Sequence, residues 1–368
     1  MSRERRPGTV VIAGGGTGGH LMPGLVLATA IRRERPDWRV VLVGARRGLE
    51  ASLLPARDFS HHLLSVEPLY RRQWWKNARW LHLFFRVVRE VRDVLDAERP
   101  ALVIGTGGYA SGPVVWLAAR RGIPTAVLEL NAFPGLAVRR LARTVREVWL
   151  GSPEARAHLR PGRNTAILET GVPIVAPDPE LRARTMSGFD LDPERRTLLV
   201  TGGSQGAQAL NEAIARLLET DLAEAFQIIW LTGKAGFARF RHFHRPPEVR
   251  VYDFLDPIAP AYSVADLAIT RAGMMTVAEV CAWGIPSIMV PLPSAAADHQ
   301  TPNARAMAEA GAAIHLPQSE LTPDRLAEVI SELLASPDRL VAMRRAALAR
   351  AKPDATQAIL TRIGVLSG

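Results

Sequence analysis

Two segments of the chain carry the same succession of apolar run, glycine cluster and helical pattern. The apolar, largely β-branched runs at residues 9–13 and 197–200 each end at a group of glycines, and helical patterns begin at Pro23 and Gln208. Continuous apolar runs bounded by turn residues are typical of strands buried in a parallel sheet. The pattern therefore predicts two domains, each of which opens with a strand, a glycine loop and a helix.

Further apolar runs of strand length alternate with helical patterns in both halves. They cover residues 39–43, 101–104, 125–128, 227–231, 249–252, 267–270 and 287–290. Such alternation implies parallel sheets covered by helices on both faces. The predicted fold class is α/β, with two doubly wound, Rossmann-like domains. Ligands of such sheets bind at the carboxyl ends of the strands, so we expect the domains to face each other across a ligand-binding cleft.

A proline-rich stretch at residues 171–179 has no helical period and is the expected linker. The predicted domains are then residues 1–172 and 173–345. A C-terminal helix at about residues 346–368 is expected to pack back on the first domain.

Composition narrows the class of protein. The 368 residues are 48% hydrophobic and 22% charged, which excludes disordered, collagen-like and disulfide-scaffold proteins. The single cysteine, Cys281, can form no internal disulfide, as expected in a reducing compartment. The first apolar run is too short for a signal peptide, and no stretch of about 18 apolar residues predicts a membrane-spanning helix. We expect a cytosolic protein.

Charge is distributed unevenly. Residues 1–172 carry 27 basic and 14 acidic side chains, whereas residues 173–368 carry 19 and 22. A basic first half indicates an anionic partner, and nucleic acid, a membrane surface or a pyrophosphate substrate fits this charge equally well.

Residues 71–96 contain two groups of apolar side chains. A stripe at helical spacing, which predicts a core face, consists of Leu81, Phe84, Val88, Val91 and Leu95. Outside that stripe lie Trp74, Trp75, Trp80, Leu83 and Phe85, among six arginine and lysine residues. Aromatic rings beside cations suit a membrane interface. The alternative is an oversized core helix with a solvated basic face.

The glycine loops are candidate phosphate sites. A glycine loop that opens a helix binds phosphate because its N–H groups converge and the helix dipole adds positive potential; the alternative is a plain tight turn. No Gly-Lys-Ser/Thr follows either loop, and the acidic residue of a dinucleotide fingerprint is missing. A third flexible glycine loop is expected at residues 105–112, where the backbone can approach a bulky ligand.

Three further positions are candidates for chemistry. His20 closes the first glycine loop at a helix start and is a candidate general base, or else a capping or orienting residue. Glu279 enters a helix after the strand 267–270, where its carboxylate can accept hydrogen bonds from ribose hydroxyls, unless it is merely solvated. The polar segment 298–303 is expected to be a sugar-binding loop, and no ligand spacing predicts a metal.

Five motifs together resemble one family. The sequences GGGTGGHLMPG, GTGGYASGP, TGGSQGA, RAGMMTVAE and DHQTPNA stand in the order and approximate spacing of the bacterial N-acetylglucosaminyltransferases that form lipid II, the MurG family of glycosyltransferase family 28. The resemblance covers nearly the whole chain. It implies a GT-B fold and transfer of N-acetylglucosamine from UDP-GlcNAc to lipid I, with inversion at the anomeric carbon. It implies no cofactor.

The resemblance also implies roles for particular residues. The implied UDP-GlcNAc site consists of Thr17, Gly18, Gly19, Asn131, Ser204, Leu255, Met274, Met275, Thr276, Val277, Ala278, Glu279 and Gln300. In it Glu279 binds the ribose, a backbone group at Leu255 reads the uracil, and Gln300 contacts the sugar. The expected acceptor site is Gly16, Gly107, Gly108 and Tyr109, with His20 as the base and Glu129 as the alternative base.

The expected partners follow from this assignment. They are UDP-GlcNAc, lipid I, an anionic membrane surface bound through Trp74, Trp75, Trp80 and Phe85, and other proteins of cell-wall synthesis. We expect no nucleic acid, and a peripheral location on the cytoplasmic face of the bacterial plasma membrane. Two rivals remain: another GT-B enzyme, such as a UDP-GlcNAc epimerase or lipid glycosyltransferase, and a sugar-nucleotide-binding scaffold without turnover. The sequence departs from the family pattern at Leu128, Leu130, Val172, Val175 and His299.

Overall fold

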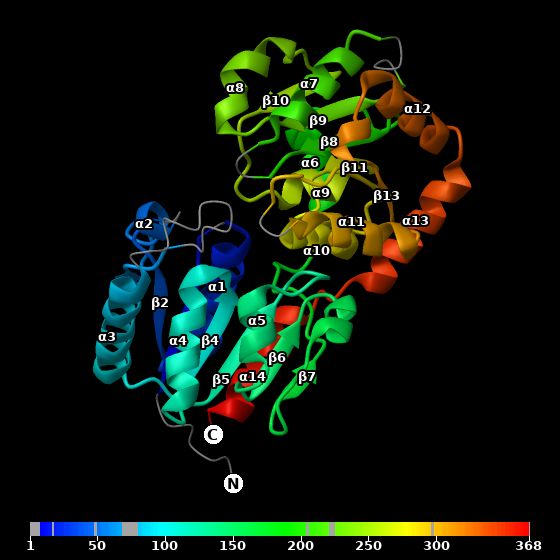
Figure 1. Ribbon diagram of the computed structural model, residues 1–368. Helices are drawn as coiled ribbons and strands as arrows, with labels where there is room; N and C mark the ends of the chain where they lie inside the picture. Colours follow the sequence, from blue (N-terminus) through cyan, green and yellow to red (C-terminus); the bar gives the residue numbers. More distant parts are fainter. Residues whose placement is uncertain are drawn as a thin grey trace. The chain divides into compact units, whose positions relative to one another are not determined.

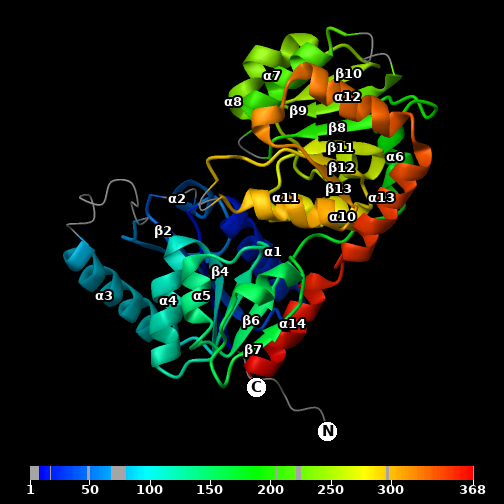
Figure 2. The same ribbon diagram turned by 45° about the vertical axis from the view of Figure 1, so that its right-hand side comes forward.

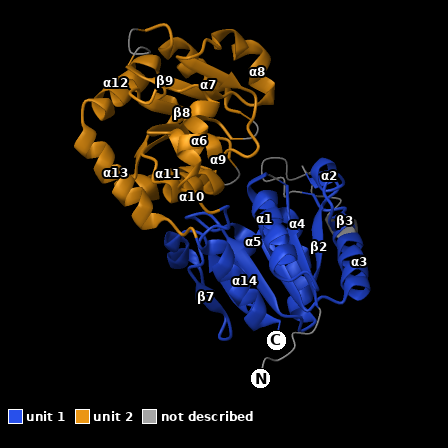
Figure 3. Ribbon diagram, turned by 180° about the vertical axis from the view of Figure 1, so that it is seen from behind, with its two compact units in different colours: residues 1–175, 354–368 blue, residues 176–353 orange. Residues whose placement is uncertain are grey.

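The computed structural model describes residues 8–16, 18–47, 50–67, 80–203, 206–220, 225–295 and 298–367, with only the backbone at 80–82. It divides the chain into two compact units (Figure 3), which we describe separately. Unit 1 contains residues 1–175 and 354–368, and unit 2 contains residues 176–353. Each unit is built around one parallel sheet (Figure 1), as the alternation of strands and helices predicts.

In the described part of unit 1 the sheet has seven strands, all paired in parallel, in the order β3-β2-β1-β4-β5-β6-β7. They are β1 (Thr9–Gly14), β2 (Arg39–Ala45), β3 (Ser60–Leu64), β4 (Leu102–Gly107), β5 (Thr125–Glu129), β6 (Glu147–Leu150) and β7 (Ala166–Leu168). The order reverses at β1 and β4, so the carboxyl ends of these two neighbours form the switch point where ligands of such sheets bind.

Helices cover both faces of the unit 1 sheet. They are α1 (Gly18–Glu34), α2 (Glu50–Leu53), α3 (Trp80–Glu98), α4 (Gly108–Arg120), α5 (Leu136–Leu141), the 3-10 helix η2 (Pro153–His158) and α14 (Ala355–Leu366). On one face α3, α4 and α5 enclose a buried cluster that includes Val11, Val103 and Val127. On the other face α1 and α14 lie side by side (Figure 3).

A buried carboxylate fixes α14 to unit 1. Glu147 is 3% exposed, and its Oε2 accepts hydrogen bonds from Trp149 Nε1 at 2.6 Å and from Arg362 Nε at 3.2 Å. Arg362 also donates through Nη2 to Oε1 of Glu147. Thr356 Oγ1 adds a hydrogen bond of 3.0 Å to the carbonyl oxygen of Ile174. These bonds join the C-terminal helix to residues about 180–215 positions earlier in the chain.

The unit 2 sheet is also parallel (Figure 2), with six strands in the described residues and the order β10-β9-β8-β11-β12-β13. The strands are β8 (Thr197–Thr201), β9 (Gln227–Leu231), β10 (Val249–Tyr252), β11 (Leu267–Thr270), β12 (Ser287–Met289) and β13 (Ala313–His315). The helices are α6 (Leu181–Gly188), α7 (Gln208–Leu217), α8 (Lys234–Phe240), η4 (Arg241–Phe243), α9 (Ala259–Val264), α10 (Met274–Trp283), α11 (Gln300–Glu309), η6 (Gln318–Glu320), α12 (Pro323–Leu334) and α13 (Pro337–Arg350).

The C-terminal region differs from the single helix expected at residues 346–368. The chain breaks at residues 351–354, which include Pro353, and forms two helices. α13 remains in unit 2, where Leu340, Met343 and Ala347 are buried and the helix packs on α10. Only α14 returns to unit 1. Proline cannot donate a backbone hydrogen bond, so it separates the two helices.

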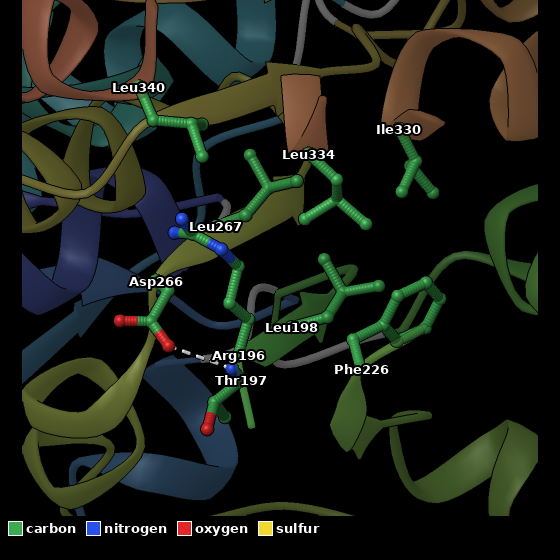
Figure 4. A pocket seen from close by; sticks show the side chains of 9 residues that line it. All are labelled: Arg196, Thr197, Leu198, Phe226, Asp266, Leu267, Ile330, Leu334 and Leu340. Atoms are coloured by element: carbon green, nitrogen blue, oxygen red, sulfur yellow. Dashed lines mark hydrogen bonds between the residues drawn. The ribbon is translucent and has the colours of Figure 1, made fainter. Parts of the chain in front are cut away.

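An apolar hollow lies at the amino ends of the unit 2 strands. Figure 4 shows Leu198 and Leu267 from β8 and β11 opposite Leu334 and Leu340 from α12 and α13. At its rim the Thr197 N–H donates to Oδ2 of Asp266 at 2.8 Å (Figure 4). Ligands of parallel sheets bind at the opposite, carboxyl edge, so the hollow lies apart from the predicted donor site.

Candidate functional site

The first and third glycine segments meet at the carboxyl edge of unit 1. Gly14 at the end of β1 pairs with Gly107 at the end of β4. Gly108 has a φ of +76°, and a Cβ there would overlap the carbonyl oxygen of Gly15. The close approach of the two backbones therefore requires glycine at this position. Tyr109 follows, and its ring lies against Gly16.

This arrangement corrects the prediction made for the third glycine segment. The expected flexible loop at residues 105–112 is a direct junction, since β4 ends at Gly107 and α4 begins at Gly108. The glycines are needed here for close packing between strand ends and helix starts. The predicted acceptor residues Gly16, Gly107, Gly108 and Tyr109 are nevertheless brought together.

His20 is the third residue of α1 and lies at this junction. Its carbonyl oxygen accepts a hydrogen bond of 2.8 Å from Thr106 Oγ1, and its ring lies against Gly107. His20 is partly exposed, although its Nδ1 atom is buried. Gly18 and Gly19 form the first positions of α1, where N–H groups lack intrahelical partners. Thr17 lies outside the described residues.

Glu129 ends β5 at the same edge and is 4% exposed. Its Oε1 accepts hydrogen bonds from the backbone N and Nδ2 of Asn131, at 3.0 and 3.2 Å, and its Oε2 accepts one from Gly135 N at 2.9 Å. Burial raises the pKa of Glu129, while these hydrogen bonds act in the opposite direction. The carboxylate thus fixes the loop that carries Asn131, an arrangement suited to holding a binding residue in place.

In unit 2 the candidate donor site begins where β11 ends. Gly273 precedes α10, whose first-turn N–H groups, at Met274, Met275 and Thr276, have no intrahelical acceptors. No side chain caps the helix at Gly273. These N–H groups and the positive end of the helix dipole suit a diphosphate. Val277 and Ala278 continue the helix, and Val277 is buried.

Glu279 lies in the second turn of α10. Tyr262 from α9 donates its hydroxyl proton to Oε2 of Glu279 at 2.9 Å. Burial raises the pKa of Glu279 to about 7, and the tyrosine hydrogen bond opposes this shift. Burial also raises the pKa of Tyr262 well above its ordinary value, so the phenol remains a donor. The remaining acceptor positions of the carboxylate can take ribose hydroxyls.

Gln300 is the first residue of α11, so the segment expected as a loop is partly helical. Its Oε1 accepts hydrogen bonds from Ala272 N at 3.2 Å and Leu292 N at 3.0 Å. The amide oxygen is therefore occupied, and Nε2 is left to donate to a sugar oxygen. Asn303 adds a bond of 3.0 Å from Nδ2 to the Ala272 carbonyl, which fixes α11 to the turn before α10.

Arg271 places a buried positive charge beside this turn. Its Nη1 donates to the carbonyl oxygens of Val290 and Pro291, both at 3.1 Å, and its Nη2 donates to Oε1 of Gln318 at 2.7 Å. Burial lowers the pKa of Arg271 to about 10. No carboxylate of the described residues lies within salt-bridge distance of the guanidinium, so its charge adds positive potential at the carboxyl end of β11.

The remaining predicted site residues are placed as follows. Leu255 follows β10, at the same carboxyl edge. The second glycine loop follows β8, and Gly203 and Gly206 there have φ of +79° and +73°. Ser204 lies outside the described residues. Within the described chain, no group of three His, Cys, Asp or Glu side chains is placed to hold a metal ion.

Sequence reasoning missed two buried partners, Tyr262 and Glu50. Tyr262 donates a hydrogen bond to Glu279, 17 positions later in the chain, and Glu50 accepts one from the backbone N–H of Gly16, 34 positions earlier. No motif connects these pairs, because each contact depends on how two segments pack. The only local signal was a polar residue beside an apolar run.

The predicted membrane surface is described only in part. Trp74 and Trp75 lie outside the described residues, and the side chain of Trp80 is not described. Phe85 is 64% exposed, and Phe84 is 47% exposed, so the prediction of Phe84 as a core residue was wrong. The face of α3 that packs on the sheet carries Val87, Val91, Val94 and Leu95. No described helix is long and apolar enough to span a bilayer.

The two parallel sheets, each with a glycine junction at its carboxyl edge, are those of a two-domain glycosyltransferase of the GT-B class. Residues 10–150 match the N-terminal domain of glycosyltransferase family 28, and residues 197–359 match its C-terminal domain. The chain therefore belongs to glycosyltransferase family 28.

Relatives and solved structures agree with this assignment. The chain is 38% identical over 365 residues to the UDP-N-acetylglucosamine--N-acetylmuramyl-(pentapeptide) pyrophosphoryl-undecaprenol N-acetylglucosamine transferase of Moorella thermoacetica, with 95% of this chain and 97% of that protein covered. The Salinibacter ruber protein of the same name is 36% identical, with 95% and 94% covered. The crystal structure of Acinetobacter baumannii MurG is similar, with a TM-score of 0.76, 28% identity, and 98% and 100% of the chains covered.

Proposed function

We propose that the protein transfers N-acetylglucosamine from UDP-GlcNAc to the C4 hydroxyl of the MurNAc residue in lipid I, with inversion, and so forms lipid II for peptidoglycan synthesis. The observation that carries the proposal is the donor half-site in unit 2, in a chain that its relatives match over nearly its full length. The N-terminus of α10 suits the diphosphate, and the Glu279 carboxylate, which Tyr262 holds by a hydrogen bond, suits the ribose. The Gln300 amide, oriented by two backbone N–H groups, suits the sugar.

The chemistry follows from these groups. The acceptor oxygen attacks the anomeric carbon, the new glycosidic bond forms, and the bond from that carbon to the diphosphate oxygen breaks. UDP leaves with the electron pair, and the α10 N-terminus stabilises its charge. His20 accepts the proton of the attacking hydroxyl. Glu129 is the alternative base, although its oxygens already accept three hydrogen bonds from Asn131 and Gly135.

A lipid-linked acceptor favours a membrane-binding surface on unit 1. Phe84 and Phe85 are exposed on α3, their rings 5.8 Å apart between centroids, and Arg86 and Arg89 are exposed beside them. Aromatic side chains among cations bind the headgroup region of anionic bilayers. The enzyme would then act as a peripheral protein on the cytoplasmic face of the plasma membrane, where other proteins of cell-wall synthesis are further partners.

The direct test is UDP release with a short-chain lipid I analogue and UDP-GlcNAc, UDP-GalNAc or UDP-glucose. We expect release only with the acceptor present and fastest with UDP-GlcNAc. Turnover of UDP-GlcNAc without lipid I, or with diacylglycerol alone, would instead indicate an epimerase or another lipid glycosyltransferase. Donor binding with no release under any condition would indicate a non-catalytic scaffold.

A further inference from the structure

Glu50 is a fully buried carboxylate beside the first glycine loop, and the proposed chemistry makes no use of it. It begins the short helix α2 and is 0% exposed. Its Oε1 accepts hydrogen bonds from the backbone N–H groups of Gly16, at 2.8 Å, and Ala45, at 2.9 Å. One side-chain oxygen therefore joins the loop after β1 to the end of β2.

Two glycines make room for this side chain. A Cβ at Gly15 would overlap Oε1 of Glu50, and a Cβ at Gly44 would overlap its Cγ. Gly15 also has a φ of +147°, which few other residues adopt. The backbone around Glu50 is thus shaped to admit the carboxylate between two strands of the sheet.

The second oxygen of Glu50 makes the arrangement costly. Oε2 is buried and has no hydrogen-bond partner among the described residues. A buried carboxylate that is only half satisfied costs free energy, and the amide oxygen of a glutamine could accept the same two backbone hydrogen bonds without burying a carboxylate. Fold stability alone therefore does not account for a glutamate here.

The loop at Gly15 and Gly16 contacts the predicted acceptor residues that follow β4. The carbonyl of Gly15 lies against Gly108, and Gly16 lies against the Tyr109 ring. A shift of the loop that Glu50 holds would therefore displace the first and third glycine segments together. Geometric errors of about 1 Å at a reacting site can lower turnover by about 100-fold.

We propose that Glu50 is a positioning residue that fixes the backbone of Gly15 and Gly16 for binding of the lipid-linked acceptor. It acts through the loop and touches no substrate. The inference rests on the proposed function for the role of this edge, but the hydrogen bonds that carry it lie within unit 1 alone.

The test compares Glu50→Ala and Glu50→Gln, with Glu147→Gln as the matched control. Glu147 is a buried carboxylate of the same unit that serves Trp149 and Arg362 instead of the loop. We expect Glu50→Ala to raise the KM for a lipid I analogue by about 10-fold or more, with the donor Kd within about 2-fold of wild type. The amide oxygen of glutamine can accept both backbone bonds, so Glu50→Gln should restore most of the acceptor KM. The control should lower Tm without changing either constant.

Gly44→Ala provides a second route if Glu50→Ala does not fold. This substitution keeps Glu50 but displaces its side chain, and it should raise the acceptor KM in the same way. An acceptor KM equal to wild type in folded Glu50→Ala or Gly44→Ala would overturn the proposal, as would a glutamine variant no better than alanine.

Hydrogen exchange separates this inference from the proposed function. In Glu50→Ala the amides of Gly16 and Ala45 should exchange faster, whereas in Glu147→Gln they should not. Faster exchange in a protein without transferase activity would contradict the proposed function, but it would still support the role of Glu50 in holding the loop. Unchanged exchange in Glu50→Ala would overturn the role of Glu50 in holding the loop.

Discussion

Four buried or partly buried glutamates differ in what their oxygens bind. Glu129 and Glu147 use both oxygens within their own unit, and Glu50 uses one to hold a backbone loop. Glu279 accepts one hydrogen bond among the described residues, from the Tyr262 hydroxyl, and lies in the second turn of α10. A carboxylate that can still accept hydrogen bonds at a ligand-binding edge is suited to binding a ligand, whereas one whose oxygens are both occupied within its own unit is structural.

We predict that Glu279→Ala weakens UDP-GlcNAc binding by about 1–3 kcal/mol, because a charged acceptor for ribose hydroxyls is lost. The pKa of Glu279 is about 7, so wild-type affinity should rise as pH increases through about 7 and the carboxylate ionises. Tyr262→Phe removes a bond that lowers this pKa, so the rise should move to higher pH. Calorimetric titrations from pH 5.5 to 8.5 would measure both effects. Unchanged affinity in Glu279→Ala would remove this residue from the site.

The same pKa has a consequence for stability. A pKa raised from 4.5 to about 7 means that the folded state binds more protons than the unfolded state between these values. Stability should therefore fall as pH rises through this window, at up to about 1.4 kcal/mol per pH unit from one group. Glu279→Gln should flatten this part of the profile, as measured by urea unfolding. Equal slopes for both proteins would show that Glu279 ionises normally.

His20 gives a kinetic prediction. If it accepts the acceptor proton, His20→Ala should lower kcat by about 10²–10⁴ and leave the donor Kd unchanged. A purely binding role would raise KM alone. Steady-state assays with saturating donor distinguish the two, and Glu129→Gln tests the alternative base in parallel. A normal kcat in His20→Ala, together with a large loss in Glu129→Gln, would transfer the role to Glu129.

At the scale of elements, sequence predicts buried strands better than short or polar ones. The runs at 227–231, 249–252 and 267–270 match β9, β10 and β11 residue for residue, because buried parallel strands are largely apolar. β3, which reads SHHLL, and the three-residue β7 and β13 lack such a run and were missed. Four-residue β6 was missed as well, since it begins with Glu147.

Helix α3 shows a second limit. Its sequence carries more than one apolar stripe at helical spacing, and periodicity cannot tell which one packs on the sheet. The structure buries Val87 and Val94 and leaves Phe84 exposed. By contrast, the meeting of the glycine segments was predictable, because parallel strands place their carboxyl ends on one edge. The partners Glu50 and Tyr262 were not predictable, because side-chain contacts between distant segments leave no periodic signal.

The attachment of α14 can be tested through Glu147. We predict that Glu147→Ala lowers the free energy of unfolding by about 2 kcal/mol, since the Arg362 guanidinium and the buried Trp149 N–H both lose their acceptor. Glu169→Ala is the control, because its pair with Arg156 is about half exposed on both sides and should contribute under about 1 kcal/mol. Equal losses in urea unfolding would contradict a special role for the buried contact.

At the scale of the whole molecule, the basic charge lies in the first half of the chain, with 27 basic against 14 acidic side chains in residues 1–172. An acceptor with a polyprenyl chain cannot leave the bilayer readily, because each CH₂ exposed to water costs about 0.8 kcal/mol. We therefore expect an enzyme with such an acceptor to bind the membrane surface, where nearby Lys and Arg side chains add about 1 kcal/mol each of attraction to anionic headgroups.

We predict that replacing Phe84 and Phe85 by serine weakens binding to vesicles of anionic phospholipid, with turnover of a water-soluble acceptor analogue retained. Both rings are exposed on α3, so their removal should leave the fold intact. Val341→Ser, at an exposed apolar position of α13 in unit 2, is the matched control and should bind like wild type. Wild-type binding should also weaken as salt rises, because screening acts over about 8–10 Å at physiological ionic strength. Flotation assays at low and high salt measure both effects. Wild-type protein that does not bind anionic vesicles at low salt would refute the membrane role of α3, and binding that is unaffected by the two serines would assign it to another surface.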